Sequence, residues 1–534
     1  MCGILLHYSD NIHIKQDKEF VSDSLFQSLV PIIRERGRDF EHYVVLEEYP
    51  IELYSSVLSL RQPLAKQPLH DERFIIQFNG ELYNEEIKTN DVEFFHKLLM
   101  KNEDIIKSLG QLNGEFSYTV IDKVAKMIYF GKDIIGRKSL CYSLVNGELY
   151  VSSCPPWDSQ DRNDFIECSN ACIYCFNMEN KSISVMDFEN HPELPKIPKV
   201  QDKLRDKIHD DSIIEELYDR LFIAVKKRLS TIFPYHLSNC DSKVAILFSG
   251  GIDCTLLAGF CGEILDENTT VDLLNVSFSN PRAKLSYDET PDRILAIKNS
   301  RMLNERYSKR NVHFNLVKVN ISYEQYLAEK ERVIKLIYPN DTEMDLSIAI
   351  AFYFAASGKN SNTQKGDSNC RVLLSGLGAD ELFGGYTRHE RIFTGMGNQI
   401  KRNLKNKPVV DTTVYDLKSL IVELRDELQC DLDRLWERNL TRDDKVISSW
   451  NKEVRYPFLD DSLVRWIVEN VPIDLKLYFD PKSGNIIRKK ALRDLALKMG
   501  LEFVAEEPKR AIQFGSKSAK MDIGSGKVKG TDKL

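Results

Sequence analysis

Two stretches of the sequence combine residue types that can carry chemistry, and one is a glycine loop. Ser249, Gly250 and Gly251 directly follow an apolar run at 244–248, which is typical of a strand buried in a parallel sheet. Glycines let the backbone turn and approach a ligand, and a helix expected to begin near Asp253 would direct its positive dipole end at the same point. The loop therefore predicts an anion site. Its sequence matches neither the GxxxxGK-S/T phosphate loop nor the GxGxxG dinucleotide-binding loop. The alternative to an anion site is an ordinary strand-to-helix turn.

Cys2 is the second candidate, because removal of Met1 would leave a thiol and a free α-amine on one residue. A free thiol has a pKa near 8.5 and an α-amine one of about 7.7–8.0, so the amine can take the thiol proton at neutral pH. This predicts a nucleophile that carries its own base. A cysteine at position 2 can equally be incidental, so the prediction depends on the segments that follow.

The composition places these candidates in a globular protein of several domains. The chain has 534 residues, of which 42% are hydrophobic and 29% charged, and this length predicts two to four domains. The net charge of -7 and the pI near 5.9 argue against a nucleic-acid partner. The longest apolar run, 348–356, is too short to span a membrane, and the start MCGILLHYSD lacks the charged region of a secretory signal.

Eleven cysteines, an odd number scattered through the chain, indicate a reducing compartment, and we expect a cytoplasmic protein. Cys168, Cys172 and Cys175 have a C-x3-C-x2-C spacing that can hold a four-iron cluster. Apolar and aromatic residues between them favour a strand instead, so we interpret the spacing as coincidence.

The chain divides at a polar segment. Residues 189–211 contain Pro192, Pro195 and Pro198 among charged residues, which predicts a linker between a domain at 2–188 and a domain at 212–534. Apolar residues at helical spacing predict a helix at about 212–229 that leads to the glycine loop. A second buried strand is expected at 272–278, and a helix after the proline in SYDETPDRILA.

The loop sequence SGGIDC resembles the SGGxDS loop of the ATP pyrophosphatases, with Cys254 in place of the final serine. In that family the loop holds the pyrophosphate portion of ATP, and its aspartate, here Asp253, binds Mg²⁺. Oxygen ligands suit this hard cation. The resemblance implies an ATP site whose residues in this part of the chain are Leu247, Ser249, Gly250, Gly251, Asp253, Cys254 and Val276.

The N-terminus MCGI resembles that of class II glutamine amidotransferases, and RGRD (36–39), SLRQPL, FNGELYN and NDVE follow in the order of that family. The resemblance implies that Cys2 attacks the side-chain amide of glutamine. Separately, each segment could be an ordinary turn, surface charge or helix start, but together they favour the family. The other implied roles are carboxylate binding by Arg61, an oxyanion hole of Asn79 and Gly80, and amine binding by Glu81 and Asp91.

LLSGLGADELFGGY (373–386) resembles the LSGEGADExFGGY signature of glutamine-dependent asparagine synthetases, and EVRYPFLD and KRAIQFGS match further segments. The resemblance implies that Ser375 and Gly376 border the ATP and that Asp380 is a second Mg²⁺ ligand. Its fold is an N-terminal Ntn-type αββα sandwich, of α+β class, followed by an α/β ATP-pyrophosphatase domain. SIAIAFYFAASG and NLTRDDK are most similar to the subgroup called asparagine synthetase domain-containing proteins.

The sequence also departs from this family. Leu377 stands where the signature has Glu, and Lys509 and Arg510 lie outside the register of the essential lysine. The leading hypothesis is synthesis of asparagine, glutamate, AMP and pyrophosphate from aspartate, glutamine and ATP. The alternatives are an amidoligase for another carboxylic acid and a catalytically degenerate binding or regulatory protein. Small molecules are the expected partners, without nucleic acid or membrane, and an oligomer is compatible with the sequence.

Overall fold

The computed structural model describes residues 2–12, 23–46, 48–157, 159–204, 210–232, 242–361, 366–405, 416–508, 510–521 and 529–534. The N-terminal part is a sandwich of two antiparallel sheets. Its strands are β1 (Cys2–Tyr8), β2 (Phe40–Val45), β3 (Ile51–Val57), β4 (Leu69–His70), β5 (Phe74–Leu82), β6 (Gly114–Asp122), β7 (Met127–Lys132), β8 (Cys141–Val145), β9 (Glu148–Ser152), β10 (Ile166–Glu167), β11 (Cys172–Asn177) and β12 (Ser182–Asp187). The strand order is β10-β8-β9-β1-β3-β2 in one sheet and β12-β11-β7-β6-β5-β4 in the other.

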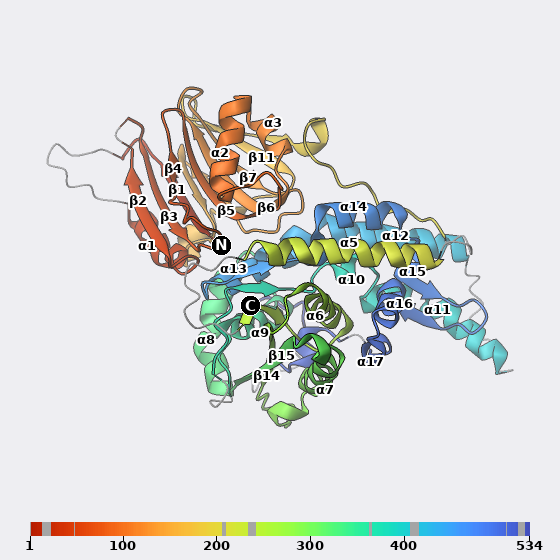
Figure 1. The fold of residues 1–534 in the computed structure, drawn as a ribbon. Coiled ribbons are helices and arrows are strands. Elements are labelled where there is room, and N and C mark those ends of the chain that lie inside the picture. The colour runs from red at the N-terminus through yellow and green to blue at the C-terminus, as the bar shows by residue number, and fades with distance from the viewer. Residues whose placement is uncertain are drawn as a thin grey trace.

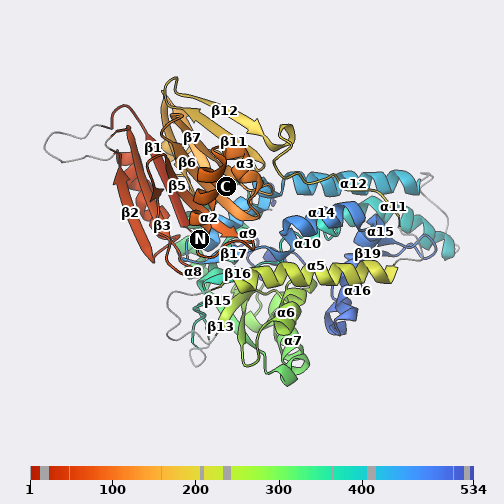
Figure 2. The ribbon, with the colours of Figure 1, turned by 45° about the horizontal axis from the view of Figure 1, so that its top comes forward.

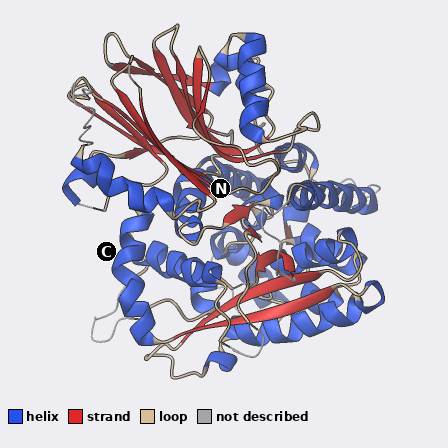
Figure 3. Ribbon diagram, turned by 60° about the vertical axis from the view of Figure 1, so that its left-hand side comes forward, coloured by secondary structure: helices blue, strands red, loops and turns tan. Residues whose placement is uncertain are grey.

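Helices cover both outer faces of the sandwich (Figure 3). Their bounds are α1 (Ser24–Arg34), α2 (Asp91–Asn102), α3 (Ile105–Gly110), α4 (Ser159–Arg162) and the 3-10 turn η1 (Phe188–Asn190). α1 packs on the first sheet, and α2, with α3 beside it, packs on the second. Ile4 and Phe130 belong to the apolar core between the sheets, whereas Phe78 and Phe95 belong to the core beneath α2. The predicted αββα fold is confirmed.

The C-terminal part contains a parallel sheet with the order β15-β14-β13-β16-β17. Its strands are β13 (Ser242–Leu247), β14 (Thr270–Phe278), β15 (His313–Ile321), β16 (Val372–Leu374) and β17 (Glu453–Arg455), and β18 (Leu477–Phe479) pairs separately with β19 (Ile486–Arg488). Later strands add on both sides of β13, so the crevice at its carboxyl end is a topological switch point. Open α/β sheets bind ligands at such points.

The helices of this part surround the sheet, and α5 runs along α6 and α16 (Figure 2). Their bounds are α5 (Asp210–Ser230), α6 (Ile252–Ile264), α7 (Pro291–Arg306), α8 (Tyr323–Ile337), α9 (Glu343–Ser357), α10 (Ala379–Leu382), α11 (Thr387–Leu404), α12 (Leu417–Asp433), α13 (Thr441–Ser448), α14 (Asp461–Asn470), α15 (Ile473–Lys476), α16 (Lys490–Lys498), α17 (Glu502–Ala505) and α18 (Ile512–Gly515). The shorter turns are η2 (Tyr287–Glu289), η3 (Ser308–Arg310), the π-helical η4 (Trp436–Leu440) and η5 (Pro457–Leu459).

Most expected elements of the C-terminal part are confirmed. The apolar run at 244–248 is β13 and the start of the loop, the predicted helix at 212–229 is α5, and the strand at 272–278 is part of β14. α7 begins at Pro291, as the position of this proline predicts. In the described part of the expected linker, Gln201 N–H donates to Val468 O at 3.0 Å and Ile473 N–H to Lys203 O at 2.9 Å. This segment therefore lies along the C-terminal part.

The two parts meet at α13, whose eight residues are all buried although four of them are charged. Figure 1 shows the N-terminus beside this helix. Asp444 accepts hydrogen bonds from Arg36 Nη2 at 2.9 Å and from Ser139 N–H at 3.0 Å. Lys445 Nζ donates to Glu167 Oε2 at 2.9 Å. The helix therefore binds the sandwich through paired charges as well as apolar contact.

A segment at 132–138 that contains Lys132, Arg137 and Lys138 also joins the two parts. Arg137 Nη1 donates to Leu459 O at 2.6 Å, and Lys138 Nζ donates to Val454 O at 2.7 Å. Arg137 and Lys138 are almost fully buried. Buried cations must be paired, so this segment fixes the sandwich against β17 and η5.

The three cysteines with cluster-like spacing belong to two separate cores. Cys168 lies in the core between the sheets with Cys172 beside it, whereas Cys175 faces the core beneath α2. Their thiols therefore do not share one ligand position, which agrees with coincidental spacing. Within the described residues, every helix is too short or too polar to cross a membrane.

Candidate active sites

The class II motifs converge on a small cavity of about 40 Å³ between the sandwich and β17. Strand β1 brings Cys2 to it, β5 brings the NGE segment, and the start of α2 brings Asp91. Five of the six predicted glutaminase residues line the cavity, and Asn79 bonds directly to Cys2. The lining includes Cys2, Arg61, Gln67, Gly80, Glu81, Asn90, Asp91 and Glu453.

Cys2 is held by polar contacts at its backbone nitrogen and at its sulfur. Its backbone nitrogen donates to Asn79 Oδ1 at 2.8 Å, and Gln67 Nε2 lies 3.4 Å from its Sγ. Burial raises the pKa of the Cys2 thiol above its ordinary value. A base next to the sulfur is therefore needed to form the thiolate, and the α-amine left by removal of Met1 would lie at the bonded nitrogen. Sequence reasoning missed Gln67, which carries no motif signal.

Asn79 and Gly80, the predicted oxyanion-hole pair, lie in the middle of β5. Gly80 has a φ of 147°, and a Cβ added there would collide with the carbonyl oxygen of Glu115 on β6. Glycine is thus required at this position of β5, beside the backbone of β6. Asn79 Nδ2 lies 3.4 Å from Ser117 Oγ, so its amide is fixed from both ends.

The residues predicted to bind the α-carboxylate and the α-amine of glutamine are paired with one another. Arg61 Nε donates to Glu81 Oε1 at 2.6 Å and lies 3.5 Å from Asp91 Oδ1. Burial, followed by the charge of Glu81, raises the pKa of Asp91 to about 8. The structure thus brings these three predicted residues together. The positive charge of Arg61 offsets the negative charge of Glu81, and the raised pKa keeps Asp91 mainly neutral at pH 7.

The C-terminal part completes this cavity with two residues that sequence reasoning did not assign to it. Glu453 of β17 lines the cavity. Arg455 Nη2 donates to Glu81 Oε2 at 3.0 Å, and its Nε donates to Glu453 Oε1 at 2.7 Å. The only available signal was their position in EVRYPFLD, a matched segment without an assigned role.

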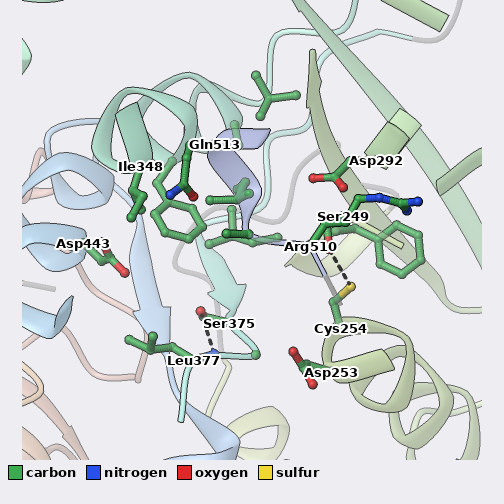
Figure 4. A pocket seen from close by; sticks show the side chains of 18 of the residues that line it. Ser249, Asp253, Cys254, Asp292, Ile348, Ser375, Leu377, Asp443, Arg510 and Gln513 are labelled. Atoms are coloured by element: carbon green, nitrogen blue, oxygen red, sulfur yellow. Dashed lines mark hydrogen bonds between the residues drawn. The ribbon is translucent and has the colours of Figure 1, made fainter. Parts of the chain in front are cut away.

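A larger cavity, of about 170 Å³, opens at the carboxyl ends of β13, β14 and β16 (Figure 4). Gly250 and Gly251 form the adjoining turn, and the other predicted ATP and Mg²⁺ residues all line this pocket. One wall is apolar and includes Val276, Ile348 and Phe352. The predicted residues in the lining are Leu247, Ser249, Asp253, Cys254, Val276, Ser375, Gly376 and Asp380.

The glycine loop has the geometry of an anion site. Gly250 has a φ of 81°, and Gly251 is the N-cap of α6 without a side chain to cap the first N–H groups. Those donors and the dipole of this thirteen-residue helix favour a phosphate group. Cys254 Sγ donates to Gly251 O at 3.3 Å, and burial raises the pKa of this thiol. Cys254 therefore acts as a neutral donor that braces the loop.

Lys489, which sequence reasoning missed, lies between the two predicted Mg²⁺ ligands. Its Nζ donates to both carboxylate oxygens of Asp253 at 2.7 Å and lies 2.7 Å from Asp380 Oδ1. The side chain is 1% exposed, and its backbone has a left-handed φ of 55°, which is uncommon for a residue other than glycine. The two carboxylates therefore converge on one cation position, which the Lys489 ammonium holds in this structure.

Leu377 lies half-buried in the pocket wall and packs against the apolar core. The adjacent Ser375 Oγ accepts a hydrogen bond from Leu377 N–H at 3.3 Å. Arg510 reaches the pocket lining while remaining exposed, whereas Lys509 lies outside the described residues. Arg442 and Asp443 of α13 also line this pocket, without having been predicted.

The two parts of the fold correspond to a glutamine amidotransferase domain joined to an asparagine synthase domain. The asparagine synthase family model matches residues 224–527, and the glutamine amidotransferase domain model matches residues 56–156. The first match covers more than half of the chain, and the chain belongs to the asparagine synthase family.

Relatives of the same description span the whole chain. An asparagine synthetase domain-containing protein of Saccharomyces cerevisiae is 38% identical, over 100% of this chain and 99% of that protein. Asparagine synthetase domain-containing protein 1 of Homo sapiens is 27% identical, over 98% of this chain and 96% of that protein. A solved glutamine phosphoribosylpyrophosphate amidotransferase from B. subtilis is 12% identical and covers 46% of this chain and 61% of that chain, with a TM-score of 0.28.

Proposed function

We propose that the protein transfers the amide nitrogen of glutamine to a carboxylic acid that it activates with ATP, with aspartate as the expected acceptor. The products would be asparagine, glutamate, AMP and pyrophosphate. The observation that carries this proposal is the position of α13. It pairs Asp444 with Arg36, whose Nε lies 3.4 Å from Cys2 O, and it supplies Asp443 to the ATP pocket. One buried helix thus lines the ATP pocket and reaches Cys2 through Arg36, which supports transfer of ammonia through the interior.

In the glutaminase cavity, the α-amine of Cys2 would take the thiol proton while the sulfur attacks the amide carbon of glutamine. Asn79 and Gly80 would supply donors to the oxyanion, and such preset donors are worth about 2.7–4 kcal/mol each. Arg61 would exchange its bond to Glu81 for the substrate carboxylate, which releases Glu81 and Asp91 for the substrate amine. Water would then hydrolyse the thioester to glutamate.

In the larger pocket, the base of ATP would lie against the apolar wall and its phosphates against the glycine loop. Both carboxylates, of Asp253 and Asp380, already converge on one cation, so they fit a Mg²⁺ ion. Phosphate oxygens would complete its set of oxygen ligands. The ion would neutralise phosphate charge during activation of the acceptor. Lys489 would then be free to pair with a phosphate.

Lys489 also favours a second candidate, a binding protein whose synthetase site no longer turns over. An ammonium bonded to both carboxylates competes with a metal for them. Leu377 motivates a third, an amidoligase of the same architecture for a different carboxylic acid, because it makes this part of the acceptor wall apolar.

Incubation of the purified protein, with Met1 removed, tests all three. With ATP, Mg²⁺, glutamine and aspartate, we expect asparagine and AMP in equal amounts. Pyrophosphate release with another carboxylic acid and none with aspartate would support the amidoligase. ATP binding without AMP formation for any acceptor would contradict the proposed synthesis and support the binding protein.

A further inference from the structure

Asp443 is a buried carboxylate with one unused oxygen. Its Oδ1 accepts from Arg442 Nε at 2.9 Å and lies 2.8 Å from Arg442 Nη2. Its Oδ2 is buried and has no hydrogen-bond partner among the described residues. Only 1% of Asp443 is exposed. An unpaired buried carboxylate oxygen costs several kcal/mol in general, so its retention calls for a ligand that it meets there.

The ligand position lies in the ATP pocket, which Asp443 lines. Figure 4 shows its side chain entering across the pocket from Ser249 and Cys254, in the region of Ile348 and Leu377. These two neighbours are apolar and offer no hydrogen bond to the carboxylate. A small ligand with an N–H or O–H group would satisfy Oδ2.

The same turn of α13 also bonds to the sandwich, through a residue that does not line the pocket. Asp444, the next residue, accepts from Arg36 Nη2 and from Ser139 Oγ, at 2.9 and 2.7 Å. Arg36 in turn reaches Cys2 O. A nitrogen nucleophile that leaves Cys2 and passes this turn of α13 would therefore meet Asp443 on entering the pocket.

We propose that Asp443 Oδ2 accepts an N–H of the ammonia that enters the pocket and takes its proton as the amide forms. The ammonia lone pair forms the C–N bond at the carbonyl carbon of the acyl adenylate, and one N–H proton passes to Oδ2. The bond from that carbon to the AMP oxygen breaks, and AMP leaves with the electron pair. This inference rests on the proposed function.

The electrostatics around Asp443 suit a base at neutral pH. Burial raises the pKa of Asp443 to about 6, against the lowering effect of Arg442. The other charged or titratable groups facing it are Asp444 on α13, Asp345 from α9 and the hydroxyl of Tyr456 after β17. At pH 7 the carboxylate is mostly ionised, yet it is more basic than an exposed aspartate.

The test separates activation of the acceptor from attack by nitrogen. ATP–pyrophosphate exchange measures adenylate formation, and amide formation from ammonium chloride measures the later step. For Asp443→Asn we expect near wild-type exchange and a loss in amide formation of roughly 10²–10⁴-fold, the usual worth of general-base help. Wild-type amide formation should fall as the pH drops below about 6, because Asp443 becomes protonated there, and the variant should lack this step.

Asp345→Asn is the matched control, because Asp345 also pairs with Arg442, at 3.1 Å, but does not line the pocket. It should keep amide formation close to wild type. Hydroxylamine should show a smaller loss than ammonia in Asp443→Asn, because it is less basic and gives up its proton more readily once bonded. If Asp443→Asn melts well below wild type, Asp443→Glu, which keeps a carboxylate, should retain more amide formation than Asp443→Gln.

Equal amide formation in Asp443→Asn and wild type would overturn the inference. Equal losses of exchange and amide formation would also overturn it, because Asp443 would then shape the pocket without acting on nitrogen. Absence of exchange in the wild-type protein with every acceptor would refute the proposed function itself. These three results are distinct, and the selective loss of amide formation alone supports Asp443 as the proton acceptor.

Discussion

The glutaminase cavity and the ATP pocket differ in how their charges are balanced. In the cavity, Arg61 and Glu81 neutralise each other, and Arg455 adds a second cation to Glu81. In the pocket, Lys489 balances two carboxylates while Asp443 keeps an unbonded oxygen. A zwitterionic substrate such as glutamine can replace internal pairs one for one. The pocket instead has two other features. Lys489 occupies a cation position for which a metal ion would compete, and Asp443 has a carboxylate oxygen that accepts no hydrogen bond from the described residues.

Cys2→Ala should give the largest difference between the activities of the two sites. Glutamine hydrolysis should be abolished, because the nucleophilic sulfur is removed, while amide formation from ammonium chloride should remain. Glutamate release measures glutamine hydrolysis, and AMP formation measures the synthetase reaction. Cys172→Ala, which alters a half-buried cysteine of β11, is the matched control. Glutamate release by Cys2→Ala at the wild-type rate would show that Cys2 is not the nucleophile.

Lys489→Met tests whether the pocket depends on its internal cation. Removal of the ammonium leaves Asp253 and Asp380 facing each other, and loss of one partner from a buried ion pair costs about 3–5 kcal/mol. Thermal unfolding should therefore occur at a lower temperature, and added Mg²⁺ should restore more stability to the variant than to the wild-type protein.

Lys490→Met is the control for that experiment, because Lys490 pairs with Asp494 on the partly exposed face of α16. It should change the melting temperature little and gain nothing from Mg²⁺. An equal response to Mg²⁺ in Lys489→Met and wild type would mean that the two carboxylates do not form the cation site.

The smallest expected effect is the pH dependence of glutamine binding. The pKa of Asp91 is raised to about 8, so this carboxyl is mainly protonated at pH 7 and gains charge as the pH rises through 8. The charged form pairs with the substrate ammonium, so affinity should increase with pH, by up to tenfold per unit below the pKa. Calorimetric titration of Cys2→Ala with glutamine measures this without turnover, and Asp91→Asn should remove the dependence.

The sequence predicted the positions of those candidate residues that belong to a local pattern. The glycine loop, the NGE segment and Cys2 lie where strand-to-turn patterns and matched motifs place them. Asp91 also starts α2, with Asn90 as its N-cap, so the helix-start alternative is confirmed and is compatible with the predicted role of Asp91. The αββα and α/β folds followed from the same ordered motifs.

The missed residues act through contacts between distant segments. Lys489 belongs to a short basic run without a motif, and only the three-dimensional fold, in which α16 packs against α6, brings it between the two carboxylates. Arg137 and Lys138 resemble surface charges in sequence but are buried between the two parts. Asp443 has a neighbour of identical type, and only the three-dimensional structure separates the aspartate that faces the pocket from the one that binds Arg36.

The pairing of Arg36 with Asp444 also has a consequence for protein synthesis, because the two residues are 408 positions apart. At about 5–20 residues per second, the ribosome needs on the order of 20–80 s to make the intervening chain. Glu453 and Arg455, which complete the glutaminase cavity, are made later still. The cavity is therefore finished only when most of the synthetase domain has been translated, so a nascent chain is not equipped to release ammonia while the domain that would receive it is still largely unmade.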